Sequence, residues 1–204
     1  GMEVTLLEKL PQVTPGLDGD MAAYLEEYIK SNDVAVMTDA SVIEINNDSV
    51  ILSDGKEISA DLVLLATGVR PNTDLAAAAG IELGATGAIR VNAKMQTNLL
   101  DIYACGDCTE QFHVVAGKTA YRPLGSTANK TGRIAGDSMT GGDLEFRGIL
   151  GTVIFKIFDM TVAQTGLSER EAIEQGYEVV VCHNIKPNKP EYMGGKEMVI
   201  KGIA

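Results

Sequence analysis

The run Thr97-Asn-Leu-Leu-Asp-Ile-Tyr-Ala-Cys-Gly-Asp107 constrains the fold of this chain more than any other stretch. Ile102 to Ala104 predict an apolar strand that leads into Gly106, and a glycine lets the backbone approach a ligand closely. Asp107 follows at the carboxyl end of that strand, where open α/β sheets bind their ligands. The run therefore predicts an α/β protein, and the Asp107 carboxylate can accept hydrogen bonds from a sugar or polyol hydroxyl, although a strand followed by Gly-Asp is common in itself.

Composition narrows the classes of partner. The chain has 204 residues, a net charge of −11 and no basic cluster, which argues against nucleic-acid and membrane-surface partners. Its longest apolar run, Leu62 to Ala66, is too short to cross a bilayer, and no signal peptide opens the sequence. Three cysteines, an odd number, favour reduced thiols and a cytoplasmic location.

Apolar periodicity and turn residues predict alternating helices and strands. Asp18 can cap a helix that extends to Ser31, Pro123 can start a helix that extends to Met139, and Ser168 with Glu171 predicts a capping box. A further short helix is expected at 74–79. Strands are expected at 2–7, 34–37, 41–45, 49–52, 62–66, 88–91, 102–104, 151–158, 160–165, 177–185 and 197–200.

Four segments in order resemble the FAD-dependent pyridine nucleotide-disulfide oxidoreductases. Gly1–Lys9 resembles the second strand of a Rossmann unit. Residues 97–107 resemble the second flavin-binding motif and, with residues 123–133, the return segment of the flavin domain. Residues 66–73 are similar to the A-T-G-x-x-P-N crossing between the nicotinamide and flavin domains. The sequence after Gly148 resembles the interface domain of the NADH oxidase, NADH peroxidase and coenzyme A-disulfide reductase branch.

The resemblance implies an α/β fold in three parts. Residues 1–72 would be a partial Rossmann-like NAD(P)-binding domain, and residues 73–145 the C-terminal return segment of the FAD domain. Residues 146–204 would be a partial α+β interface, or dimerisation, domain, which implies a homo-oligomer.

The resemblance also assigns FAD-binding residues. Asp107, with Gly106 before it, would bind the ribityl chain of FAD, and Leu124, Gly125 and Ser126 would lie near the isoalloxazine ring. The helix that begins there directs free N–H groups and a positive dipole end towards the ring. An ordinary helix start remains the alternative for these three residues.

Two residues are assigned to NAD. Glu8 would accept hydrogen bonds from the adenosine ribose, which favours NAD over NADP, although Lys9 beside it could accommodate a phosphate. Gly68 would let the nicotinamide approach the backbone. A solvent-exposed strand end at Glu8 and a simple turn at Gly68 are the structural alternatives.

The pair Cys105 and Cys108 forms a single C-x-x-C, which can be a redox pair or half a metal site. No second pair exists, and His113 and His183 lack ligand spacing with it. We therefore expect packing roles for these thiols and no metal site.

Some of the family's chemistry is absent from these residues. They contain no G-x-G-x-x-G loop, the usual seat of a dinucleotide pyrophosphate, and no residue matches the redox-active Cys of the family. We therefore expect no catalytic residue here and weak or no FAD binding by this chain alone. The predicted function is a part of a longer enzyme that passes hydride from NAD(P)H through FAD to a small-molecule acceptor, namely a thiol or disulfide, peroxide or oxygen. The alternative is a catalytically inert structural or dimerisation fragment.

Overall fold

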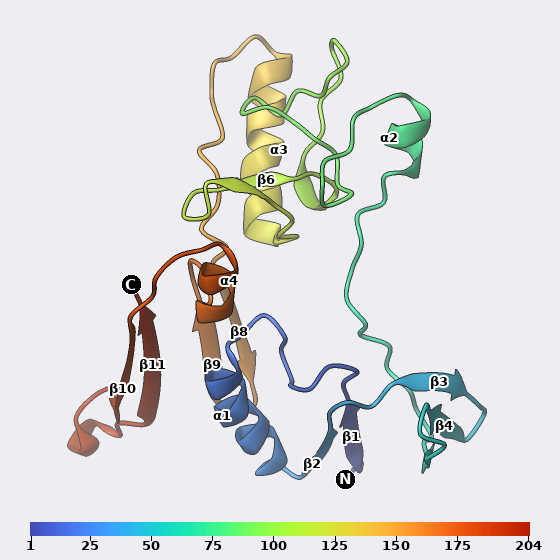
Figure 1. Cartoon of the computed structure of the whole chain (residues 1–204), viewed down its shortest axis with the longest axis vertical. Coiled ribbons are helices and arrows are strands. Elements are labelled where there is room, and N and C mark those ends of the chain that lie inside the picture. Colours follow the sequence, from blue (N-terminus) through green and yellow to red (C-terminus); the bar gives the residue numbers. More distant parts are fainter. The chain divides into compact units, whose positions relative to one another are not determined.

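The computed structural model describes residues 1–204 and contains two compact units (Figure 1). The first unit comprises Gly1–Leu65 and Ser168–Ala204, and the second comprises Ala66–Leu167. No helix in either unit combines the length and the apolar character that a membrane crossing requires.

The first unit opens with a β-α-β arrangement. Strand β1 (Val4–Leu7) lies parallel to β2 (Val34–Met37), and helix α1 (Gly19–Lys30) connects them. The helix buries Ala22, Leu25 and Ile29, three positions that recur on one helical face. The strands and helix predicted for this segment are confirmed, and the parallel pair is typical of a dinucleotide-binding unit.

A three-stranded antiparallel sheet follows, made of β3 (Val42–Ile45), β4 (Ser49–Leu52) and β5 (Glu57–Ser59). Its buried cluster consists of Ala40, Val50 and Leu52, against which Leu7 and Met37 of the parallel pair pack. The sheet is therefore joined to β1 and β2 through one small apolar core.

The first unit also contains helix α4 (Glu169–Glu174) and an antiparallel hairpin of β10 (Val181–Pro187) and β11 (Glu197–Ile203). The 3-10 turn η2 (Glu191–Met193) lies between the two strands. Helix α4 begins with the predicted capping box, because the Ser168 hydroxyl accepts from the Glu171 amide and the Glu171 carboxylate accepts from the Ser168 amide.

The second unit is built around helix α3 (Gly125–Met139). Its other elements are α2 (Asp74–Ala78), the 3-10 turn η1 (Gly106–Cys108), the pair β6 (Gln111–His113) and β7 (Lys118–Ala120), and the hairpin of β8 (Val153–Ile157) and β9 (Met160–Gln164). Turn η1 packs against α3. Helix α3 buries Thr127, Thr131 and Ala135, so two of its three buried side chains carry hydroxyl groups.

Three of the predicted strands are wrong. Residues 62–66 form no strand, and the side chains of Leu62 and Leu64 are 79% and 87% exposed. Ile89 and Tyr103 take part only in isolated bridges, so 88–91 and 102–104 are not strands either. A strand requires a continuous neighbour to satisfy its backbone hydrogen bonds; residues 62–66 have none, and the other two segments pair with their neighbours only at single positions.

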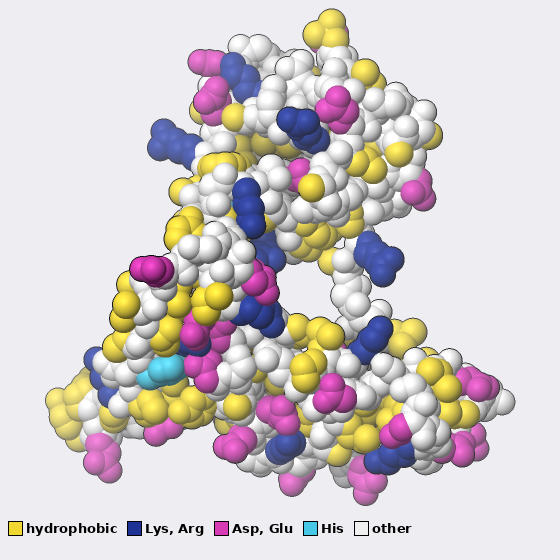
Figure 2. All heavy atoms as spheres, in the orientation of Figure 1, with side chains coloured by type: hydrophobic (Ala, Val, Ile, Leu, Met, Phe, Trp, Pro, Cys, Tyr) yellow, Lys and Arg dark blue, Asp and Glu magenta, His cyan; other side chains and the backbone are white.

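Charged side chains of both signs are scattered over the face seen in Figure 2. On the face seen in Figure 2 the acidic side chains are numerous and the basic ones are scattered rather than gathered into a patch. This distribution agrees with the net charge of −11.

Candidate functional site

Asp107 lies at the surface of the second unit, in turn η1. Its side chain is exposed and makes no hydrogen bond or ion pair within the chain. The preceding Gly106 has a φ of +80°, which favours glycine. The carboxylate is therefore free to accept hydrogen bonds from an external hydroxyl group.

Hydroxyl groups hold the backbone on both sides of Asp107. The Gly106 N–H donates to Thr131 Oγ1 at 3.0 Å, and Thr109 Oγ1 donates to the Gly106 carbonyl at 2.9 Å. The Tyr121 hydroxyl donates to the Asp107 carbonyl at 2.9 Å. These contacts fix the main chain of the turn and leave its carboxylate unpaired.

Helix α3 begins beside this segment of the fold. Leu124 is its N-cap residue and provides no side-chain cap, while Gly125 and Ser126 are exposed in the first turn. The Leu124 carbonyl accepts from the amides of Thr127 and Ala128. The first-turn N–H groups and the positive end of the helix dipole are thus available to a negatively charged group.

The two residues predicted to bind NAD lie in different units. Glu8, at the end of β1, is half-buried and its Oε1 accepts from the Leu10 amide at 2.8 Å. Gly68 lies outside any helix or strand with a φ of +89°, and a Cβ there would have no atom within 4 Å. The positive φ fits the predicted turn and requires a residue like glycine.

Cys105 and Cys108 are free thiols. The Cys108 Sγ donates to the Cys105 carbonyl at 3.4 Å, and burial, more than any other effect, raises the pKa of the Cys108 thiol. A raised pKa lowers the thiolate fraction, so the thiol is a poorer nucleophile and a poorer metal ligand.

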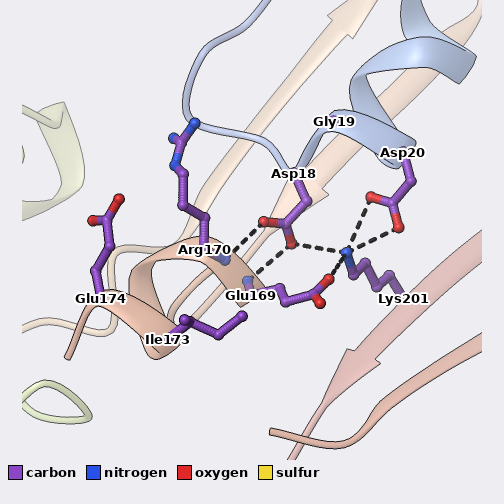
Figure 3. A pocket seen from close by; sticks show the side chains of 8 residues that line it. All are labelled: Asp18, Gly19, Asp20, Glu169, Arg170, Ile173, Glu174 and Lys201. Carbon is purple, nitrogen blue, oxygen red and sulfur yellow. Dashed lines mark hydrogen bonds and ion pairs between the residues drawn. The ribbon is translucent and has the colours of Figure 1, made fainter. Parts of the chain in front are cut away.

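A hollow of about 380 Å³ opens in the first unit, where the start of α1, helix α4 and strand β11 meet (Figure 3). Lys201 is one of the residues that line it, and its side chain is only 5% exposed. Three carboxylates surround the Lys201 ammonium group, at 3.2 Å for Asp18, 2.9 Å for Asp20 and 2.6 Å for Glu169. Burial opposes the charged form, but the three hydrogen bonds outweigh it and raise the pKa of Lys201 above its ordinary range.

The predicted capping of α1 by the Asp18 side chain is wrong. Asp18 is the N-cap residue of α1, yet its side chain makes no hydrogen bond to that helix. Its carboxylate instead accepts from the amides of Glu169 and Arg170, in the first turn of α4. No local sequence signal identifies this link, because its partners lie far apart along the chain.

Comparisons with known proteins decide the family. Residues 1–130 match the family described as "Pyridine nucleotide-disulphide oxidoreductase". The chain belongs to this family. The chain is 44% identical over 154 residues to the NAD(P)H sulfur oxidoreductase (CoA-dependent) of Pyrococcus furiosus, with 75% of this chain and 35% of that protein covered.

Solved structures of family members have the same fold. A NAD-dependent persulfide reductase from A. fulgidus is similar, with a TM-score of 0.94 and 38% identity, over 99% of this chain and 38% of that one. A FAD-dependent pyridine nucleotide-disulphide oxidoreductase from Desulfovibrio vulgaris has a TM-score of 0.84 and 34% identity, over 100% of this chain and 54% of that one. The α/β fold class predicted from the sequence is confirmed. The chain spans 35–46% of the length of four curated relatives that it matches.

FAD is the cofactor that this family implies, and the residues of the second unit fit part of it. An unpaired, exposed Asp107 carboxylate suits a polyol, and the uncapped start of α3 suits a ring system that gains negative charge. The described residues include no G-x-G-x-x-G loop for the pyrophosphate. The residues present therefore suit the ribityl chain and the ring of FAD, but not its pyrophosphate.

Proposed function

We propose that this chain forms the part of an FAD-dependent NAD(P)H oxidoreductase that contacts the flavin polyol, the flavin ring and the nicotinamide nucleotide. The observation that supports this most strongly is the Asp107 carboxylate, which is exposed and unpaired on a turn whose backbone is held by three hydroxyl groups. The family match over residues 1–130 supports the same assignment.

In this proposal each residue has a limited task. Asp107 accepts hydrogen bonds from the ribityl hydroxyls, and Gly106 allows the polyol to approach the backbone. Gly125 and Ser126 present first-turn N–H groups that stabilise negative charge on the ring, and Leu124 covers it. When bound, FAD supplies the chemistry of accepting hydride from NAD(P)H and passing two electrons to an acceptor.

The nucleotide contacts are proposed in the same way. Glu8 at the end of β1 accepts from the adenosine ribose, and Gly68 admits the nicotinamide. The parallel β1-α1-β2 arrangement supports the first role, and the positive φ of Gly68 supports the second.

The acceptor, the assembly and the location also belong to the proposal. Two of the relatives named above are a sulfur oxidoreductase and a persulfide reductase, which favours a thiol or disulfide acceptor over peroxide or oxygen. We retain the domain boundaries 1–72, 73–145 and 146–204, with the last segment forming a homo-oligomer interface. The free thiols of all three cysteines support a cytoplasmic location.

The test is FAD binding by the protein that the complete gene encodes. Asp107→Asn should weaken FAD binding about ten-fold, because a hydrogen bond to a charged acceptor is lost. Asp101→Asn is the matched control, since Asp101 is an exposed aspartate nearby without a hydrogen bond or ion pair of its own. An FAD dissociation constant that is the same for both variants would overturn the proposal.

A further inference from the structure

We infer that Thr131 and Tyr121 are positioning residues whose hydroxyl groups hold the Gly106–Asp107 backbone and so aim the Asp107 carboxylate at the flavin polyol. This inference rests on the proposed role of Asp107 in FAD binding. It assigns to two residues outside the recognised motif the task of holding that motif in its binding geometry.

Thr131 is placed to hold the turn from the side of the helix. Its side chain is 0% exposed, and its Oγ1 lies 2.9 Å from the Thr127 carbonyl and 3.2 Å from the Ala128 carbonyl. A hydroxyl has one donor and two acceptor sites, so donation to the helix orients a lone pair towards the Gly106 N–H. The helix thereby fixes the amide immediately before Asp107.

The helix surface next to Thr131 allows the turn to come close. A Cβ on Gly106 would lie 3.7 Å from the Ala128 Cβ, and a Cβ on Gly132 would lie 4.0 Å from the Cys105 sulfur. Small residues on α3 therefore bring Thr131 within hydrogen-bonding distance of the turn. A larger side chain at 128 or 132 would push the two apart.

Tyr121 holds the other side of Asp107. Its hydroxyl donates to the Asp107 carbonyl, and burial followed by the negative charge of Asp107 raises the pKa of the phenol. The phenol therefore stays protonated and remains a donor at neutral pH. Thr109 Oγ1 donates to the Gly106 carbonyl. The Gly106 N–H, the Gly106 carbonyl and the Asp107 carbonyl thus each have a hydroxyl partner.

This arrangement favours ligand binding because the geometry of the carboxylate is set before the ligand arrives. A carboxylate on a loose turn would lose conformational freedom on binding, which reduces affinity. A side chain on a backbone held at three points loses less.

The experiment uses two variants of the protein encoded by the complete gene. Tyr121→Phe removes only the hydroxyl, and Thr131→Val replaces the hydroxyl with a methyl group. Each should weaken FAD binding about five-fold, the effect of one ordinary hydrogen bond. Thr131→Ser should restore the affinity because it restores the hydroxyl. Tyr192→Phe is the control, since Tyr192 is exposed, lies outside the flavin-binding motif and has a hydroxyl that makes no hydrogen bond.

A double-mutant cycle separates positioning from general stabilisation. If Tyr121 acts through Asp107, Tyr121→Phe should cause no further loss of FAD affinity in the Asp107→Asn background. Faster amide exchange at Gly106 in Thr131→Val should accompany its loss of affinity. Equal losses from Tyr121→Phe in both backgrounds would overturn the inference.

The failures of the two proposals can be told apart. If Asp107→Asn leaves FAD binding unchanged, the proposed function fails. If Asp107→Asn weakens binding but Tyr121→Phe does not, only the positioning role fails. Tyr121 is partly exposed, so its variant keeps the test available even if Thr131→Val does not fold.

Discussion

The ammonium group of Lys201, in the last strand, lies 3.2 Å from the carboxylate of Asp18, just before the first helix. The two side chains are 5% and 10% exposed, so this ion pair is largely shielded from water. Asp18 also accepts from the first-turn amides of α4. One carboxylate therefore connects α1, α4 and β11 within the first unit (Figure 3).

Removal of the Lys201 charge should destabilise the first unit. Lys201→Met leaves three carboxylates close together with no cation among them, so we expect the free energy of unfolding to fall by about 2 kcal/mol. Lys196→Met makes the same chemical change at an exposed position that has no ion pair. Urea denaturation of both variants is the measurement, and equal midpoints would contradict a stabilising role for Lys201.

Asp20 should contribute to acid sensitivity. Burial alone would raise its pKa, but hydrogen bonds from Lys201 and His183 outweigh this and leave the pKa below its ordinary value. A carboxyl with a lowered pKa stabilises the fold above the pKa of the unfolded chain, about 4, and this contribution is lost as pH falls through the folded pKa.

The free energy of unfolding of the unmodified chain should therefore fall more steeply than that of Asp20→Asn between about pH 5 and about pH 2. Asp61→Asn, at an exposed aspartate without hydrogen bonds, serves as the control and should keep the steeper slope. If Asp20→Asn and the unmodified chain show the same slope, the carboxyl is not linked to folding in this way.

Local sequence signals predicted the elements that depend on local interactions. The capping box at Ser168 and the paired strands around Asp159 are present, because each depends on residues close together in the sequence. The run at Leu62 has strand-like composition, but a strand also needs a partner, and apolar composition does not supply one.

The candidate site shows the same division. Asp107 and Gly106 could be identified because they stand in a recognisable run, and Gly68 because a turn required it. Thr131 could not be identified, because the sequence does not show that the hydroxyl of a helical threonine accepts a hydrogen bond from the amide of a distant turn. Lys201 and Asp18 meet only through the fold, so neither was predicted to pair with the other.

Gly148 is required by a close backbone approach. Its φ is +99°, and a Cβ there would lie 2.5 Å from the carbonyl oxygen of Phe112. Gly148→Ala should destabilise the second unit by about 3 kcal/mol or more. The new Cβ would strain the positive φ and clash with a backbone carbonyl, which cannot move aside as a side chain can.

Gly136 offers the matched comparison for that substitution. It lies in α3, and a Cβ there would have no neighbour within 4 Å. Gly136→Ala should raise the free energy of unfolding by about 0.5–1 kcal/mol through helix propensity. Denaturation of the two variants should move the midpoint in opposite directions, and a tolerated Gly148→Ala would contradict the close approach.

Glu8 should influence the choice of nicotinamide nucleotide. Glu8→Gln removes the charge but keeps an oxygen that can accept from Leu10, so the loop is preserved. In the protein encoded by the complete gene, we expect NADH binding to weaken about ten-fold and NADPH binding to change less. Glu3→Gln, before the same strand, is the control, and an unchanged NADH dissociation constant in Glu8→Gln would rule out the ribose contact.

The 204-residue chain by itself should purify without stoichiometric FAD. A pyrophosphate is usually bound by the N–H groups of a glycine-rich loop at a helix start, and these residues contain no G-x-G-x-x-G. Asp107 and the start of α3 offer contacts only for the polyol and the ring, which are too few to retain the cofactor through purification. The measurement is the visible flavin absorbance per mole of chain, with the protein encoded by the complete gene as the positive control. A full equivalent of flavin on the 204-residue chain would show that its residues form a complete cofactor site, and the division of roles proposed here would then be wrong.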